Sequence, residues 1–240
     1  QPASDWVREG PRELRTLTPK LQKLTKPVQE ANKAAENIAR VAPDSIVVMV
    51  TNPLDAMVQL GLHVTGFPRT RLMGQSGVLD SARLRTFIAQ ELGVSVSSVS
   101  ANILGGHGNT MVALPRLSSV GGVPLAGLLP QERIDALVQR AVNGGAEIVQ
   151  LLKTGSAYYA PAAAAVSMVD AIVLDKKEIL PCAVRLDGEY GMAGVVVGVP
   201  VKLGASGVEQ VLELELNDAE KAALTRSADA VRETVAIMGL

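Results

Sequence analysis

Apolar positions along the chain follow two spacings, one typical of helices and one typical of buried strands. Between residues 28 and 41 the apolar residues recur at roughly helical spacing, which predicts an amphipathic helix. A continuous apolar run then spans residues 46–50, and such runs are typical of strands buried on both faces of a parallel sheet. Residues 54–64 return to the helical spacing. The order helix, strand, helix predicts one α/β unit in the first third of the chain.

The remaining residues alternate between helical and extended patterns. Residues 68–75 are predicted to form a short link, after which Ser76 and Gly77 open a helix. We expect an α/β protein with a partial parallel sheet in the N-terminal third of the chain and a mixed α+β arrangement in the remainder. The other predicted elements are extended structure at 99–104 and 111–114, helices at 131–153, 158–174 and 217–237, and antiparallel strands at 178–185 and 194–203.

The composition narrows the possible partners and locations. The 240 residues are 48% hydrophobic and 20% charged, a balance that allows a sizeable core. The net charge of −1 and the aromatic content of 2% argue against nucleic acid or an anionic membrane as a partner. No apolar run approaches the roughly 20 residues of a membrane span. The single cysteine, Cys182, excludes an internal disulfide, and we expect a soluble cytoplasmic protein without a signal peptide.

The most informative combination of residues is a histidine on a glycine turn with a carboxylate upstream. His107 lies in the segment GGHG, and Asp80 lies at the start of the helix that follows Ser76. If Asp80 meets one imidazole nitrogen, it stabilises the protonated ring and leaves the other nitrogen free to exchange a proton. Arg83 follows Asp80 by about one helical turn, and its guanidinium can bind a carboxylate through two parallel hydrogen bonds. The set predicts chemistry on a small hydroxy or keto acid.

Each of these residues also has an ordinary structural interpretation. A histidine in a glycine-rich loop is most often a turn residue, and an LDxxR helix start is most often a cap with a surface arginine. The segment TNP at residues 51–53, directly after the apolar run, adds a third element and favours a site. We expect His63 to be a packed or surface residue and Cys182 a small core residue, with no metal site, because no close ligand spacing links them. No G-x-x-x-x-G-K-[ST] motif occurs, which argues against a phosphate-loop hydrolase.

Five segments, taken in order, resemble the lactate/malate dehydrogenase family, and most closely its malate dehydrogenases built on the lactate dehydrogenase plan. They are APDSIVVMVTNPLDAM, GQSGVLDSARLRTFIA, GGHGNTMVALPR, LLKTGSAYYAPAAA and GVPVKLGASGVEQVLEL. The resemblance implies NAD as the cofactor, a small dicarboxylate or 2-hydroxy acid as the substrate, and a homodimer or homotetramer. It also implies that residues 1–74 are an incomplete dinucleotide-binding domain with a partial Rossmann-type parallel sheet, and that residues 75–240 are the α+β catalytic domain of the family.

The resemblance further implies roles for individual residues. His107 would be the proton donor and acceptor in the interconversion of malate and oxaloacetate, and Asp80 its orienting carboxylate. Arg83 would bind the substrate carboxylate, and Asn52 would hydrogen-bond the substrate oxygen beside the nicotinamide ribose. The cofactor would carry the hydride while the protein positions it. Val50 and Thr51 would line the nicotinamide pocket, and the small side chain of Ala157 would face the substrate.

The chain departs from the family's pattern in three places. The glycine fingerprint G-x-G-x-x-G, which binds the pyrophosphate, does not occur before Ala34, as a truncated or frame-shifted coding region would produce. Arg8, Arg12 and Arg15 lack the flanking residues of the family's mobile loop and receive no role, so malate and lactate are not distinguished. Asn109 stands where the family usually has Asp. Without the pyrophosphate-binding fingerprint, we expect NADH to bind with a Kd no tighter than roughly 1 mM. The alternatives to a malate dehydrogenase are an impaired, subunit-binding family member and a lactate dehydrogenase.

Overall fold

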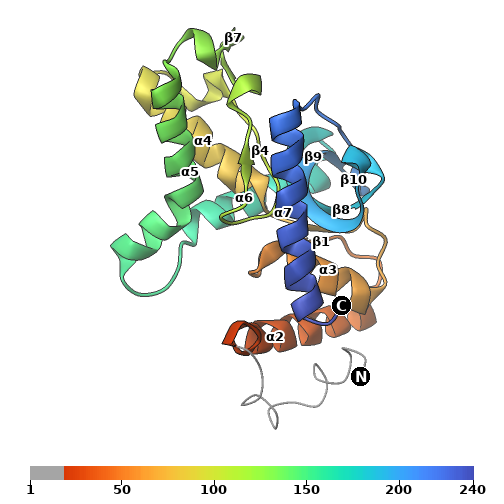
Figure 1. Cartoon of the computed structure of the whole chain (residues 1–240). Coiled ribbons are helices and arrows are strands. Elements are labelled where there is room, and N and C mark those ends of the chain that lie inside the picture. Colours follow the sequence, from red (N-terminus) through yellow and green to blue (C-terminus); the bar gives the residue numbers. More distant parts are fainter. Residues whose placement is uncertain (1–18) are drawn as a thin grey trace.

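The computed structural model describes the backbone of residues 19–240 and the side chains from residue 24 onward (Figure 1). Its largest sheet has five strands in the order β1-β2-β8-β9-β10, and α3 (Leu54–Thr65), α4 (Gly77–Leu92), α6 (Tyr159–Val173) and α7 (Asp218–Ile237) pack against it. The N-terminal helix α2 (Pro19–Val41) lies beside the C-terminal end of the chain, where Val28 and Met238 share a small core. Arg8, Arg12 and Arg15 lie outside the described residues.

The five-stranded sheet combines one parallel pair with an antiparallel part. Strand β1 (Val47–Met49) runs parallel to β2 (Leu72–Gly74), which confirms the arrangement predicted from the apolar run. Gly74 of β2 lies opposite Ala183 and joins this pair to the antiparallel strands. Those strands are β8 (Glu178–Asp187), β9 (Ala193–Gly204) and β10 (Gly207–Val211).

Two predictions of extended structure need correction. The expected link at 68–75 contains strand β2, whose three residues are all buried and too few to show a periodic pattern. The predicted strand 99–104 divides into β3 (Val99–Ser100) and β4 (Ile103–Leu104), which pair in different sheets because the chain turns between them. Their sheets are completed by β5 (Val112–Ala113), β6 (Ser119–Val120) and β7 (Val123–Pro124).

The predicted helices are all present, although α2 begins well before residue 28. Pro27 lies inside α2, and a proline within a helix is costly because it removes a hydrogen bond. Burial of Val28 against Met57 and Leu60 of α3 offsets this cost. The other helices are α3 (Leu54–Thr65), α4 (Gly77–Leu92), α5 (Gln131–Leu152), α6 (Tyr159–Val173) and α7 (Asp218–Ile237), with short 3-10 helices at Val96–Ser98, Pro115–Leu117, Leu125–Gly127 and Glu189–Gly191.

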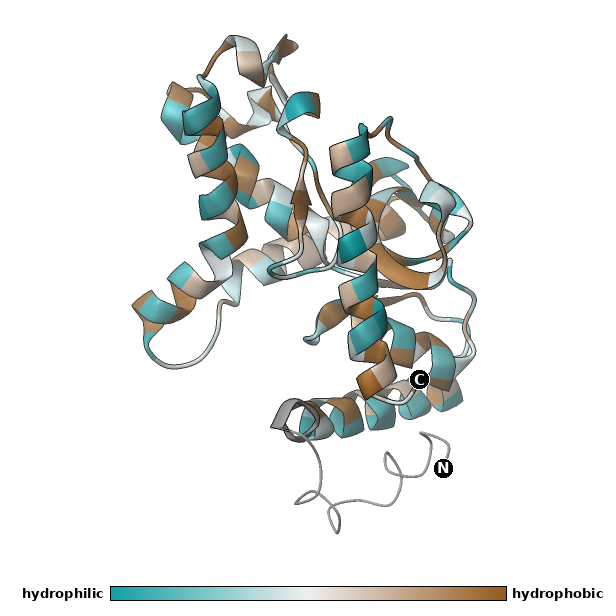
Figure 2. Cartoon of the chain, in the orientation of Figure 1, coloured by the Kyte–Doolittle hydropathy of each residue, from teal (hydrophilic) through white to brown (hydrophobic). Residues whose placement is uncertain are grey.

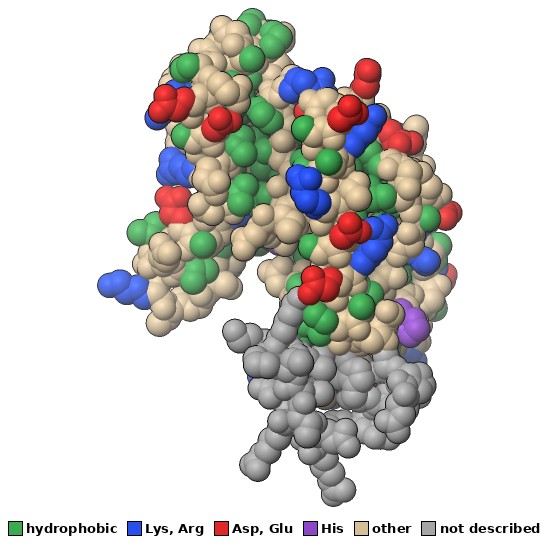
Figure 3. All heavy atoms as spheres, in the orientation of Figure 1, with side chains coloured by type: hydrophobic (Ala, Val, Ile, Leu, Met, Phe, Trp, Pro, Cys, Tyr) green, Lys and Arg blue, Asp and Glu red, His purple; other side chains and the backbone are tan. Residues whose placement is uncertain are grey.

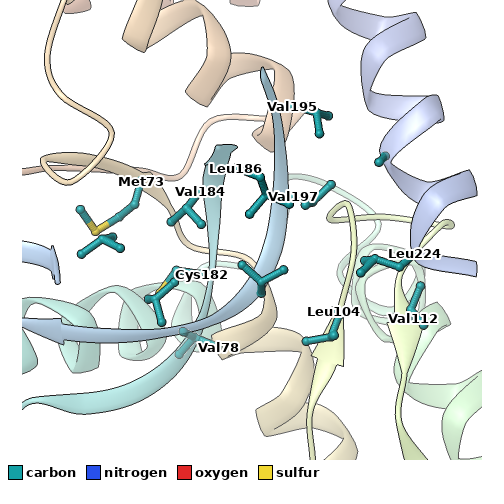
Figure 4. Close-up of a cluster of buried hydrophobic side chains, with 14 of the residues drawn as sticks. Met73, Val78, Leu104, Val112, Cys182, Val184, Leu186, Val195, Val197 and Leu224 are labelled. Carbon is teal, nitrogen blue, oxygen red and sulfur yellow. The ribbon is translucent and has the colours of Figure 1, made fainter. Parts of the chain in front are cut away.

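The largest hydrophobic core surrounds β8 and β9 (Figure 4). Cys182, Val184 and Val197 are almost completely buried there, together with Met73 of β2 and Leu224 of α7. The expectation that Cys182 is a core residue is confirmed, and burial raises the pKa of its thiol. Apolar residues concentrate on the strands and on the inward sides of the helices, while polar residues cover the outside (Figure 2). Packing of this core therefore holds the strands in place, and the strands determine where the loops at the edge of the sheet lie.

Helix α7 shows how the sequence pattern sets the packing of one element. Asn217 accepts a hydrogen bond from the Glu220 N–H, and the Glu220 side chain accepts one from the Asn217 N–H, both at 2.9 Å; such reciprocal caps stabilise helices by about 1 kcal/mol. Leu224 and Ala228 are buried under the outer, alternately basic and acidic face of α7 (Figure 3). No helix in the described part of the chain is long and apolar enough to cross a membrane.

Candidate active site

His107 lies in the glycine turn between β4 and β5. Gly105 and Gly108 have φ values of 85° and 146°. Residues that carry a Cβ atom strongly disfavour this backbone region. Gly105 also pairs with Gly198 of β9 through two backbone hydrogen bonds of 2.8 and 2.9 Å. A Cβ atom at Gly105 would lie only 2.7 Å from the Oγ atom of Ser227. The turn can therefore pack closely between the sheet and α7 only because it is built from glycine.

The backbone of the turn is held by side chains from two helices distant in sequence. The Gly106 N–H donates a hydrogen bond of 2.8 Å to Ser227 Oγ of α7. The His107 N–H donates one of 2.8 Å to Oδ2 of Asp55, which lies in the first turn of α3. Both side chains are buried, and buried N–H groups that keep a partner avoid a penalty of about 1–3 kcal/mol each. Side chains of α3 and α7 therefore fix the backbone from which the imidazole projects.

The expected contact between Asp80 and His107 is present. Oδ2 of Asp80 lies 2.8 Å from Nδ1 of His107, and Oδ1 of Asp80 accepts a hydrogen bond of 3.0 Å from Arg83. Asp80 is 1% exposed and is placed by α4, whose first turn follows the capping hydroxyl of Ser76. Because an ionised carboxylate only accepts hydrogen bonds, Nδ1 carries the hydrogen in this pair. Nε2 is then the nitrogen that can exchange a proton.

The charges around His107 favour its protonated form. Burial of the ring lowers the pKa of His107, but the hydrogen bond to Asp80 and the negative charges of Asp80 and Asp55 outweigh it, with Arg83 opposing them. The pKa is therefore raised above the ordinary value of 6.5. Burial also raises the pKa of Asp55, to about 6, although the His107 N–H and the His107 charge act in the opposite direction.

A cavity of about 600 Å³ brings most of the expected site residues together, within the size range of small-molecule sites. It lies between the end of β1, the His107 turn, α4 and the α5–α6 segment, on the side where the surface in Figure 3 is hollowed. Thr51 is exposed and does not line this cavity, so its place at a nicotinamide remains a prediction. The expected residues that do line it are Val50, Asn52, Arg83, His107 and Ala157, and Asn109 lies among them.

The described residues fit the nicotinamide end of a cofactor better than its pyrophosphate end. Val50 and Asn52 follow the parallel strand β1 and lie at its carboxyl end, the edge at which open α/β sheets bind ligands. Val50 is 52% exposed, so an apolar surface is available to a flat ring at this edge. The sequence offers no glycine fingerprint for the phosphates.

A second cavity, of about 490 Å³, lies between α4, α5 and α6 and shares Leu79 and Arg83 with the first. Its described lining is mostly apolar and includes no histidine. Proton transfer needs a group that titrates near neutral pH, so the first cavity, which holds His107, is the candidate active site.

Sequence reasoning missed two residues that hold the site. Asp55 stands in the segment TNPLD, where its carboxylate in an otherwise apolar helical turn was a possible signal. Ser227 lies on the apolar face of α7 with Leu224 and Val231, spaced three and four residues from them. A polar residue in such a stripe is exceptional. Neither pattern indicated which backbone group the side chain would meet.

A family profile described as the lactate/malate dehydrogenase, alpha/beta C-terminal domain, matches residues 77–237. The chain belongs to this family. The resemblance seen in the five sequence segments is therefore confirmed, and with it the α/β fold class. The malate dehydrogenases of Roseiflexus castenholzii and Rhodopirellula baltica are 54% and 55% identical to the chain over 200 and 204 residues. These matches cover 83% and 85% of this chain, and the chain spans 65% of the length of each relative.

Solved structures of the family match the fold closely. The malate dehydrogenase of Salinibacter ruber superposes with a TM-score of 0.86 and 48% identity, covering 88% of this chain and 69% of its own. The lactate dehydrogenase of Cryptosporidium parvum, solved with lactic acid and β-nicotinamide adenine dinucleotide, gives a TM-score of 0.88 and 42% identity, covering 91% and 71%. The family's two activities thus share the fold of this chain.

Proposed function

We propose that this chain carries the acid–base and substrate-orienting part of an NAD-dependent dehydrogenase that interconverts malate and oxaloacetate. The observation that carries the proposal is the His107–Asp80 pair, at 2.8 Å, beside a cavity that Arg83 and Asn52 also line. Relatives named malate dehydrogenase at 54% and 55% identity favour malate as the substrate. A cytoplasmic location and a homodimer or homotetramer belong to the same proposal.

When bound, NAD supplies or accepts the hydride at C2 of the substrate. Val50, Thr51 and Asn52 at the end of β1 are the residues proposed to hold its nicotinamide end. His107 handles the accompanying proton at Nε2: it donates the proton to the substrate oxygen during reduction and takes it back during oxidation. Asp80 fixes the tautomer and stabilises the ring while the ring is charged.

Arg83 is proposed to bind a substrate carboxylate, although one of its donors already faces Asp80. Its Nε atom is buried and has no hydrogen-bond partner among the described residues, and a guanidinium has five donors in all. Gly144 of α5 leaves room for the side chain, since a Cβ atom there would lie 3.1 Å from Arg83 Cδ. Arg83 thus keeps donor capacity at the wall of the cavity. Asn52, on the same wall, is proposed to hydrogen-bond the substrate oxygen.

A lactate dehydrogenase is the second candidate, because a lactate dehydrogenase is among the close structural matches. An impaired, subunit-binding family member is the third. All three share the same site geometry and differ in substrate and turnover. Measuring which substrate is reduced, and at what rate, distinguishes the three candidates.

The test is a chimera that joins this chain to the part of the Roseiflexus castenholzii malate dehydrogenase that the chain does not match. We expect NADH-dependent reduction of oxaloacetate to exceed reduction of pyruvate, and His107→Asn to lower both by roughly 10²-fold or more. His63→Asn is the matched control, because His63 is the other histidine and is exposed on α3. A folded, NADH-binding chimera without turnover would support the impaired member instead, and a preference for pyruvate would support the lactate enzyme.

A further inference from the structure

Asp55 contacts the turn that carries His107 from a direction that Asp80 does not cover. Its Oδ2 atom accepts the His107 N–H at 2.8 Å, while Asp80 meets the ring of the same residue at Nδ1. The two carboxylates come from different helices, α3 and α4. His107 is therefore held by one acid at its backbone and by another at its side chain.

The burial of Asp55 is unusual for an ionisable side chain. It is 5% exposed, and its Oδ1 atom has no hydrogen-bond partner among the described residues. An ionised carboxylate with an unpaired oxygen is costly in a protein interior unless a positive charge lies nearby. The N-terminal turn of α3 favours a negative charge only modestly, and His107 is the cation that acts on Asp55.

We propose that Asp55 is a positioning residue for His107, which anchors the His107 backbone to α3 and supplies a second negative charge that favours the protonated imidazole. The inference rests on the proposed function, in which His107 moves the substrate proton. It also links two parts of the site, since Asp55 lies in the first turn of the helix that directly follows Asn52 and Pro53. Asn52, which is proposed to contact substrate and cofactor, is thus linked through α3 to His107, the proposed proton-transfer group.

Apart from His107 itself, the charged groups that act on His107 and Asp55 come from helices α3 and α4. Asp80 and Arg83 of α4 and Asp55 of α3 act on His107, and His107 and Asp80 act on Asp55. Ser227 and Val231 of α7, which pack beside Gly106, carry no charge. Because the interaction of two titrating groups is reciprocal, the charge of Asp55 must raise the proton affinity of His107 by as much as protonated His107 lowers that of Asp55.

The experiment is an NMR titration of this chain, which needs neither cofactor nor turnover. The chain has two histidines, so a His63→Gln background leaves one histidine signal to follow. Asp55→Asn keeps the shape and an oxygen that can accept the His107 N–H but removes the charge. We expect the proton-binding constant of His107 to fall about threefold or more, as when one of two nearby charges is removed from a partly buried site. Asp229→Asn, an exposed change on α7, is the control and should leave the titration unchanged.

A second arm keeps the proposal testable if Asp55→Asn does not fold. In His107→Gln the Asp55 carboxyl is unchanged, and its ¹³C signal should titrate at higher pH than in the parent chain. An unshifted His107 titration in folded Asp55→Asn, or an unshifted Asp55 titration in His107→Gln, would overturn the inference. These outcomes are independent of the proposed function, because an inactive chimera with an intact coupling rejects only the function.

Discussion

Asp80 is shared between two partners: its Oδ2 atom lies 2.8 Å from Nδ1 of His107 and its Oδ1 atom accepts a hydrogen bond of 3.0 Å from Arg83. The carboxylate is 1% exposed, so both partners act on it with little screening by water. This relationship ties the proposed proton donor to the proposed carboxylate clamp. A change at Asp80 should therefore alter both the titration and the substrate binding of the site.

The first prediction concerns Asp80→Asn in the chimera. The amide removes the negative charge and can donate to Nδ1, so the pKa of His107 should fall and the wrong tautomer should be favoured. Reduction of oxaloacetate needs the protonated ring, and its rate should decline at lower pH than in the parent, with a maximum reduced by roughly 10²-fold or more. The pH–rate profile checks this, and an unchanged profile would separate Asp80 from proton transfer. Asp229→Asn serves as the exposed control.

The second prediction concerns stability and pH. The pKa of His107 is raised above 6.5 in the folded chain, so the folded state binds a proton more tightly than the unfolded state. The resulting stabilisation is fully present below about pH 6.5 and is lost as the pH rises through the folded-state pKa. The free energy of unfolding of the parent, relative to His107→Gln, should decrease over that window in urea titrations. A constant difference from pH 6 to pH 9 would contradict the raised pKa.

The third prediction concerns Ser227→Ala on α7. The change removes the acceptor of the buried Gly106 N–H, and an unsatisfied buried donor costs about 1–3 kcal/mol. Urea denaturation should show a loss of that size. Ser206→Ala, at an exposed turn position, should change the stability by no more than about 0.5 kcal/mol. Equal effects of the two changes would mean that Ser227 does not hold the turn.

The fourth prediction concerns Gly198→Ala in β9. A Cβ atom at Gly198 would lie 2.6 Å from Ser76 Oγ and 2.7 Å from the carbonyl oxygen of Gly105. The turn must then move away from the sheet, at a cost of about 1–3 kcal/mol, and the His107 signal should shift in NMR spectra. Gly127→Ala is the control, because its Cβ atom would meet only Val123 at 4.0 Å. A neutral Gly198→Ala would show that the close approach is not required.

The fifth prediction compares Gly144→Ala with Gly145→Ala in α5. Each change should stabilise the helix by about 0.5–1 kcal/mol through helix propensity. At Gly144 the new methyl group would lie 3.1 Å from Arg83 Cδ, whereas at Gly145 the nearest Arg83 atom is 3.8 Å away. We therefore expect Gly145→Ala to be the more stable variant in urea titrations. Equal gains would mean that Arg83 adjusts without cost.

Much of the local structure followed from patterns within short segments. The apolar run at 46–50 predicted β1, the helical spacing of apolar residues predicted α3, α5 and α7, and Ser76 with Gly77 predicted the start of α4. Strand β2 was missed because three residues carry no period. The strand predicted at 99–104 was divided because its two halves pair with different partners. Pairing partners distant in sequence are not encoded in a local pattern.

The candidate site divides in the same way. His107, Asp80 and Arg83 were found from residue type, helical spacing and a glycine turn, and the contact between His107 and Asp80 was expected before the fold was known. Asp55 and Ser227 were not found, because each acts on a backbone N–H that only the packing of α3 and α7 against the turn brings within reach.

The sequence by itself determined which chemical groups the chain carries and where its helices and its longest strands form, because these depend on side-chain chemistry and on local periodicity. Only the tertiary structure decided that two carboxylates, Asp55 and Asp80, act on one histidine, and that Val50 and Asn52 at the end of β1 face the same cavity. Those relationships depend on how the core around β8 and β9 orients α3, α4 and α7. Packing of that kind is settled by the whole buried surface rather than by any one segment.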